Sequence, residues 1–252
     1  MTLTYWNDYS ELFEGCIAYW DGSLTSDGKL QDIIGGYHGI INGASKTAAN
    51  RFGVANSNYY YNSTKSDYTQ LPSVALSACP ITICYWARYP SIIVYPPPDG
   101  TIIWNVFCFV YNSPDIQSGF AVGDGSTYNL VAMRKHPTIS GPQVLVYSTV
   151  HVNTTDYYFV ACRYNANYTM DIFVNTVKTS SSDSNASYTG FTQGNKICGK
   201  TWQSSAGWST DLYMGELMVF HSAMSDEKIK ALYELTKNKY LYPIQSGTRG
   251  VE

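Results

Sequence analysis

Strand-like segments recur along most of this chain, with clusters of turn residues and no helical pattern between them. Segment 80–90, PITICYWARYP, is apolar on both faces, as expected of a strand that lies between two packed layers. Similar segments occupy 15–21, 100–112, 119–124, 128–135, 142–152, 156–165, 168–178, 196–200 and 211–221. Short strands at such spacing predict an all-β fold, a two-sheet antiparallel β-sandwich of the jelly-roll type.

Segments 156–165 and 168–178 are predicted to be consecutive antiparallel strands, because the turn residues Asn-Ala-Asn join them. In the second segment, Met170, Ile172 and Val174 share one face and alternate with polar residues on the other. Since side chains of a strand point to opposite faces in turn, this alternation predicts a half-buried strand.

The end of the chain contains one strong helical pattern. Ser225 is a good N-cap, and the two residues that follow it are acidic, as the helix dipole favours. Ile229, Leu232 and Tyr233 form an apolar stripe at helical spacing. We therefore expect one short helix over 226–237 that lies on the sandwich.

Charge and composition exclude several classes of function. The net charge is −3 and no run of Lys or Arg occurs, whereas nucleic acid binding needs dense neutralisation of phosphates. No apolar stretch is long enough to span a membrane, and residues 1–15 lack the basic and apolar parts of a secretory signal. The six cysteines form no C-x-x-C pair and lie mostly in apolar segments, which predicts buried free thiols.

Five motifs, in order, resemble the LamG-like group of the concanavalin A-like lectin/glucanase superfamily. They are GCIAYWDGSLTSDGKLQDIIGGYHGIINGA, KSDYTQLP, ITICYWARYP, DYYFVACRYNANYTMDIFVNTV and NKICGKTWQSSAGWSTDLYMGELMVFHSAMSDEKIKALY. The resemblance implies a jelly roll with the C-terminal helix as a lid. It predicts an N-terminal arm over 1–14, a LamG-like domain over 15–240 and a tail over 241–252. One departure is Thr176, where the family usually has glycine, so we expect that hairpin to be altered or longer.

The superfamily includes glycoside hydrolases, which need two carboxylates that flank the scissile bond. Its glucanase branch carries them as E-x-D-x-x-E on one strand, and no such pattern occurs here. Glu216 is the one glutamate in a central strand, and no acidic residue stands two positions from it. We therefore expect no enzyme, and a glycoside hydrolase is the least favoured reading. The resemblance leaves a structural calcium open, but the loop aspartates form no cluster in the sequence, so no cofactor and no metal ligand is assigned.

Two aromatic loops are predicted to bind a ligand. The loop KTWQSSAGWSTDLY sets aromatic residues among small polar ones, and YPSIIVYPPPDGT is rich in proline. Exposed aromatic rings stack on sugar rings; alternatively, these rings seal the edge of the core. The predicted ligand-binding residues are Trp202, Trp208, Tyr213 and Tyr95.

The two ends of the chain carry aromatic residues that are predicted to dock on neighbouring subunits, or alternatively to fold back on their own domain. The predicted assembly residues are Tyr5, Trp6, Phe13, Tyr240 and Tyr242. Together with the missing secretion signal and the nearly solitary domain, they predict a non-catalytic virion surface protein, a phage decoration or fibre component made in the cytoplasm of the host cell. Its expected partners are other virion proteins, further copies of itself and possible host-surface glycans. The alternative is a free-standing carbohydrate-binding module.

Overall fold

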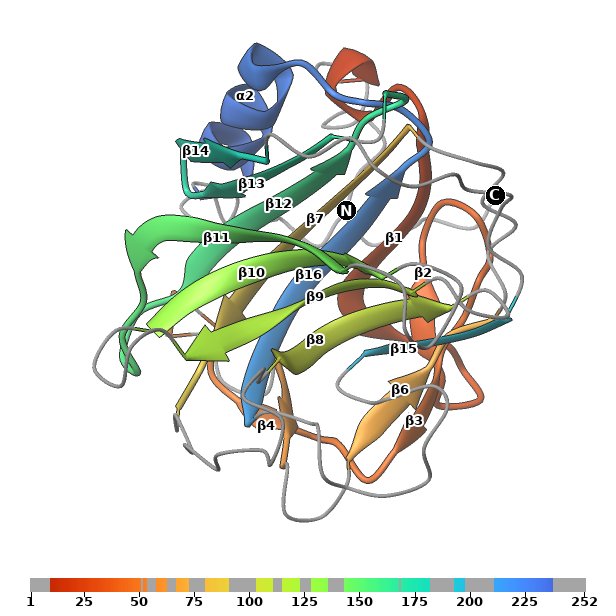
Figure 1. Cartoon of the computed structure of the whole chain (residues 1–252). Coiled ribbons are helices and arrows are strands. Elements are labelled where there is room, and N and C mark those ends of the chain that lie inside the picture. Colours follow the sequence, from red (N-terminus) through yellow and green to blue (C-terminus); the bar gives the residue numbers. More distant parts are fainter. Residues whose placement is uncertain are drawn as a thin grey trace.

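The computed structural model of the chain contains two antiparallel β-sheets that pack face to face, with a short helix on the far side of one of them (Figure 1). This architecture confirms the predicted two-sheet β-sandwich. The structure describes residues 10–50, 52–53, 58–62, 67–72, 80–90, 103–110, 115–122, 128–135, 143–167, 169–181, 193–197 and 211–237.

Sheet A runs through the middle of the molecule and holds most of the described core. Its hydrogen-bonded order is β14 (Val177–Ser180), β13 (Met170–Val174), β12 (Tyr158–Tyr164), β7 (Ile81–Arg88), β16 (Leu212–Phe220), β1 (Cys16–Leu24) and β2 (Leu30–Asp32). The start of β16 also pairs with β5 (Asn58–Tyr61), which in turn pairs with β4 (Ser45–Ala48).

Sheet B crosses in front of sheet A in Figure 1 and covers one of its faces. Its order is β11 (Gln143–His151), β10 (Tyr128–Lys135), β9 (Asp115–Val122), β8 (Ile103–Val110), β15 (Gln193–Ile197), β6 (Tyr68–Gln70) and β3 (Ile40–Asn42). Strands distant in sequence are neighbours here, as β8 and β15 are, so the sheet depends on non-local pairing.

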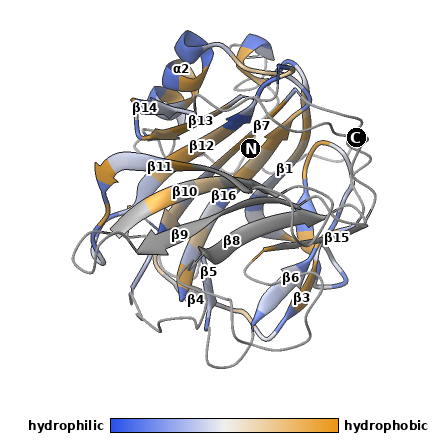
Figure 2. Cartoon of the chain, viewed as in Figure 1, coloured by the Kyte–Doolittle hydropathy of each residue, from blue (hydrophilic) through white to orange (hydrophobic). Residues whose placement is uncertain are grey.

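The central strands of sheet A are buried on both faces. In β7, Ile83 and Tyr85 belong to the core between the sheets, whereas Cys84 and Trp86 belong to a second core on the outer face, and all four side chains are at most 4% exposed. The two-sided apolar pattern of this segment therefore predicted its place between two layers correctly. Figure 2 shows the same hydrophobic colouring along β7, β12 and β13.

The second core lies under helix α2 (Asp226–Lys237), whose bounds confirm the helix expected from the sequence. Ser225 caps it, since its Oγ accepts a hydrogen bond from the backbone N–H of Lys228 at 3.1 Å. The indole N–H of Trp86 donates to Thr236 Oγ1 at 2.9 Å, and the Trp86 ring stacks on Tyr233 with centroids 5.8 Å apart. The helix is thus fixed to sheet A by both apolar and polar contacts.

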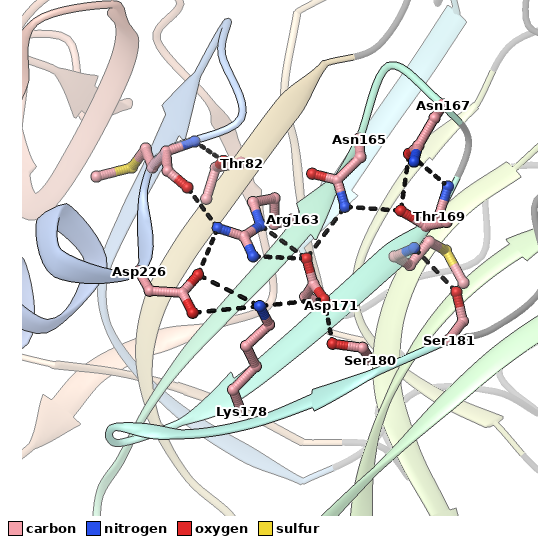
Figure 3. A network of polar contacts seen from close by, with 12 residues as sticks. Thr82, Arg163, Asn165, Asn167, Thr169, Asp171, Lys178, Ser180, Ser181 and Asp226 are labelled. Atoms are coloured by element: carbon pink, nitrogen blue, oxygen red, sulfur yellow. Dashed lines mark hydrogen bonds and ion pairs between the residues drawn. The ribbon is translucent and has the colours of Figure 1, made fainter.

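A network of charged side chains, which we call the helix latch, joins the start of α2 to β12, β13 and β14 (Figure 3). It consists of Arg163, Asp171, Lys178 and Asp226. Arg163 contacts the Asp171 carboxylate through Nε and Nη2, both at 2.7 Å, and Asp226 through Nη1 at 2.8 Å. Its Nη1 also donates to the backbone carbonyl of Met224 at 2.6 Å. Because their charges are paired and hydrogen-bonded, Arg163 and Asp171 can lie buried, whereas the side chains of Lys178 and Asp226 are about one third exposed.

The latch explains why the predicted half-burial of β13 is wrong. Met170, Ile172 and Val174 do share the face toward sheet B, as expected. The opposite face is covered as well, because Phe173 joins the second core and Asp171 joins the latch. All five residues of β13 are therefore buried.

The hairpin between β13 and β14 keeps a two-residue turn, so of the two expected alternatives, an altered or a longer hairpin, the longer one is wrong. Val174 pairs directly with Val177, and Asn175 takes the left-handed conformation with φ 55°. Asparagine tolerates this conformation better than most residues. Its side-chain oxygen also accepts a hydrogen bond from Phe159 N–H at 3.1 Å, which holds the turn against β12.

The short 3-10 helix η1 (Ser10–Phe13) precedes β1 and belongs to the domain. Phe13 stacks on Tyr19 of the same chain, with centroids 6.0 Å apart, and packs against the second core. This placement favours the alternative in which Phe13 folds back on its own domain over a docking arm. Tyr5, Trp6, Tyr240 and Tyr242 lie outside the described residues.

The cysteines in the described part of the chain include three free thiols. Cys84 and Cys162 are buried as predicted, and Cys16 is half-buried. Burial raises the pKa of Cys16 to about 12 and the pKa of Cys84 well above its usual value. These thiols therefore stay protonated and pack as small apolar groups. Within the described residues, no helix combines the length and the apolar character needed to cross a bilayer.

Candidate ligand-binding site

The outer face of sheet A carries a row of aromatic and cationic side chains at the end farthest from α2. Tyr213, near the start of β16, pairs with Tyr60 of β5 on one side and with Arg88 of β7 on the other. Paired residues of antiparallel strands project from the same face, so the three side chains lie next to one another. Figure 1 shows that β16 begins near β4, at the opposite end of the sheet from the helix.

The row is closely stacked. The rings of Tyr60 and Tyr213 have centroids 4.8 Å apart and planes inclined by 29°. Arg88 Cζ lies over the Tyr213 ring at 4.3 Å from its centroid, and over the ring of Tyr157, which precedes β12, at 5.5 Å. We call these four half-buried residues, Tyr60, Tyr213, Arg88 and Tyr157, the tyrosine–arginine row.

Tyr157 closes the row and is held by two hydrogen bonds. Its hydroxyl donates to the backbone carbonyl of Ala49 at 2.8 Å and accepts from the side-chain amide of Asn58 at 3.0 Å. Stacking and hydrogen bonding therefore fix the row before any ligand arrives, which lowers the entropic cost of binding.

Both faces of the Tyr213 ring are covered by its neighbours, Tyr60 and Arg88. Tyr213 thus offers a ligand its hydroxyl and ring edge, which differs from the open stacking platform that the sequence suggested. The hydroxyls of Tyr60 and Tyr213 make no hydrogen bond within the described residues and are not buried. The row can therefore present hydrogen-bonding groups on an aromatic base.

The electrostatics of the row differ between its two ends. Burial, together with the nearby carboxylate of Asp211, raises the pKa of Tyr60, so this hydroxyl remains a neutral donor at pH 7. On the other side of Tyr213, Arg88 carries a full positive charge. Its Nε is buried, and its guanidinium makes no hydrogen bond or ion pair with the described part of the chain.

Of the predicted ligand-binding residues, Tyr213 is part of the row, whereas Trp202, Trp208 and Tyr95 lie outside the described residues. Sequence reasoning missed Tyr60, Arg88 and Tyr157. A usable signal was present at Arg88, which is a lone cation at the end of an apolar strand.

The loop aspartates considered as calcium ligands have other partners where the structure describes them. The buried carboxylate of Asp32 accepts four backbone N–H bonds, from Tyr19, Ile34, Gly35 and Tyr37, at 2.8 to 3.1 Å. Asp67 accepts from the backbone N–H of Asn62 at 3.1 Å. In the described residues, no group of three or more His, Cys, Asp or Glu side chains has the arrangement of a metal site.

The fold and the row define a jelly roll with an aromatic, hydrogen-bonding outer face. A laminin G-type family model, described as the Concanavalin A-like lectin/glucanases superfamily, matches residues 62–230. The match covers more than half of the chain, which therefore belongs to this superfamily, as the sequence motifs predicted. A search of curated proteins finds no match.

Solved structures with this fold include several domains of larger proteins. The binding domain of Paraclostridial Mosquitocidal Protein 1 has 14% identity and a TM-score of 0.68 over 90% of this chain and 53% of that chain. Domain 4 of AbnA, a GH43 extracellular arabinanase from Geobacillus stearothermophilus solved with arabinotriose, has 15% identity and a TM-score of 0.64 over 86% of this chain and 98% of that chain. Trypanosoma rangeli sialidase has 9% identity and a TM-score of 0.60 over 89% of this chain and 33% of that chain. At such identities the likeness shows the fold alone.

Proposed function

We propose that this chain is a non-catalytic binding module that recognises glycans through the tyrosine–arginine row. The observation that carries the proposal is the stacked series Tyr60, Tyr213 and Arg88, whose two hydroxyls are not buried and whose guanidinium makes no hydrogen bond within the described residues. Glycans are rich in hydroxyls, so they need closely spaced donors and acceptors, and tyrosine supplies them with few rotors to freeze. Two structural neighbours support the proposal, because one is a binding domain and the other was solved with arabinotriose.

The non-catalytic part of the proposal rests on the carboxylates. Glycoside hydrolysis needs two of them on either side of the bond to be cleaved. In the described part of the chain, the buried Asp32 and Asp171 are engaged by backbone amides and by Arg163 respectively. Neither belongs to the tyrosine–arginine row. Asp211 and Asp67 act electrostatically on Tyr60, and Asp67 already accepts the backbone N–H of Asn62.

A glycan array probed with the intact chain tests the proposal, and conservative variants locate the site. Tyr213→Phe keeps the stack and removes one hydroxyl, so it should weaken binding by about 0.5–1.5 kcal/mol, the usual net worth of a hydrogen bond. Tyr147→Phe is the matched control, because Tyr147 is 42% exposed on β11 of sheet B, away from the row. Binding that Tyr147→Phe weakens and Tyr213→Phe leaves unchanged would place the site elsewhere, and an array without any binding would reject glycan recognition.

The setting on a virion surface stays a prediction from the sequence. We propose it as the context of the binding module, with further copies of the chain and other particle proteins as partners. Light scattering of the full chain tests the self-association that this setting requires. Assembly that is lost when residues 1–9 and 241–252 are removed supports the setting, whereas a monomer at high concentration favours the free-standing carbohydrate-binding module.

A further inference from the structure

Two arginines on the outer face of sheet A have opposite surroundings. Arg163 is buried and meets the carboxylates of Asp171 and Asp226 and the carbonyl of Met224. Arg88 is half-buried, and no acceptor oxygen in the described residues pairs with it. The half-buried Lys228, by comparison, donates to the carbonyl of Glu14 at 3.1 Å. Unlike Arg163 and Lys228, therefore, the half-buried cation Arg88 has no carboxylate or carbonyl partner among the described residues.

The contacts of Arg88 with the described residues leave its terminal Nη1 and Nη2 groups unpaired and not buried, whereas its Nε is buried. Tyr213 and Tyr157 flank the guanidinium, with Cζ at 4.3 and 5.5 Å from the ring centroids. Cation–π contacts satisfy the flat face of the group, and they use none of the N–H donors along its edge. Such an edge matches a carboxylate, which accepts two parallel hydrogen bonds from it. The row thus holds the guanidinium in one orientation, ready for a planar anion.

We propose that the tyrosine–arginine row is a subsite for an acidic sugar, whose carboxylate accepts hydrogen bonds from Arg88 while its hydroxyls meet Tyr213 and Tyr60. The inference rests on the proposed glycan binding and adds the charge of the ligand. The opposite end of the row agrees with it, because the Tyr60 hydroxyl makes no hydrogen bond within the described residues and can donate to or accept from a sugar hydroxyl. One sugar unit with hydroxyls at one end and a carboxylate at the other complements both ends.

The test compares acidic glycans with neutral counterparts of the same chain. Suitable probes are tetragalacturonic acid and its carboxyl-reduced form, and sialyllactose and lactose, titrated by calorimetry into the intact chain. At least one acid should bind about 10- to 100-fold more tightly than its neutral counterpart, as expected for hydrogen bonds to a charged group. This preference should shrink as the salt concentration rises, because salt screens the attraction between the sugar carboxylate and Arg88.

Variants of Arg88 test whether the preference for acidic glycans depends on this residue. Arg88→Gln should abolish the difference between acid and neutral counterpart, whereas Arg88→Lys should keep part of it, because lysine keeps the charge and loses the planar fork. Lys230→Gln, on the exposed side of α2, removes the same charge and should change nothing. Thermal unfolding checks that each variant is folded, and Arg88→Lys serves if Arg88→Gln does not fold.

The outcomes separate this inference from the proposed function. If neutral glycans bind as tightly as acidic ones, or if Arg88→Gln leaves the preference intact, glycan binding stands and the acidic subsite is rejected. If sulfated glycans bind and carboxylated ones do not, the carboxylate assignment is rejected. If no acidic and no neutral glycan binds, both the subsite and the proposed function are rejected.

Discussion

Replacing Arg163 with methionine tests how the helix latch stabilises the fold. The substitution removes the contacts from Nε and Nη2 to Asp171, both at 2.7 Å, and the contact from Nη1 to Asp226 at 2.8 Å. It leaves the Asp171 side chain, 6% exposed, as a buried carboxylate without its main cation. Removing one partner of a buried pair costs about 3–5 kcal/mol. Urea unfolding at pH 7 should therefore show a loss of stability of that size.

The loss should depend on pH. Burial raises the pKa of Asp171, but hydrogen bonds from Ser180 and Asn165 and the charge of Arg163 outweigh it, so the pKa lies below its usual value. In the native protein, the stabilisation that comes from ionised Asp171 is complete above the unfolded carboxylate pKa of about 4. It is lost as pH falls through the lower pKa that Asp171 has in the folded state. In Arg163→Met the buried charge is unfavourable, and protonation removes it. The difference in unfolding free energy should therefore shrink as pH falls below about 4.

The control is Lys29→Met, which breaks the ion pair with Asp27 on the surface, where the two side chains are 44% and 58% exposed. Exposed pairs contribute about 0–1 kcal/mol, so this variant should unfold almost like the native protein. A loss below about 1 kcal/mol for Arg163→Met, or a loss that does not change with pH, would refute the account of the latch.

Three further variants probe local structure by urea unfolding. Asn175→Ala should lower the free energy of unfolding by about 1–2 kcal/mol, because alanine resists the left-handed φ of 55° and removes the hydrogen bond to Phe159 N–H. Asn175→Gly should lower it less, because glycine adopts this φ freely. Equal losses would contradict the role of the backbone. Leu232→Ala should lose about 2–5 kcal/mol, because it opens a cavity in the fully buried second core; a loss below about 1 kcal/mol would mean that α2 contributes little to this core. Ser225→Ala should lose about 1 kcal/mol with the cap of α2, and an unchanged midpoint would argue against the cap.

Local sequence patterns predicted the strands and the helix more accurately than they predicted which faces are buried. The two-sided apolar run of β7 and the cap, stripe and bounds of α2 follow from residues that are close in sequence, so their periodicity carries the information. The half-burial expected for β13 failed because α2, more than 50 residues further along the chain, covers its second face. The alternation of apolar and polar residues within β13 cannot show that a helix so distant in sequence covers its second face.

The candidate site was accessible to sequence reasoning only in part. The sequence points to Tyr213 because it ends an aromatic loop, yet its neighbours in the row come from β5, from β7 and from the residue before β12. These segments meet through strand pairing, and the register of Tyr213 with Tyr60 and Arg88 cannot be read from spacing. That Arg88 has no acidic partner among the described residues likewise becomes visible only once its neighbours are known.

The most direct test of the central claim is NMR of the protein with ¹³C-labelled tyrosine rings, titrated with the glycan that binds most tightly. The account predicts that the ring resonances of Tyr60, Tyr157 and Tyr213 shift together in proportion to the bound fraction, while the resonance of Tyr147 on sheet B stays in place. Shifts confined to Tyr147 or to other tyrosines, with the row unchanged at saturation, would contradict it.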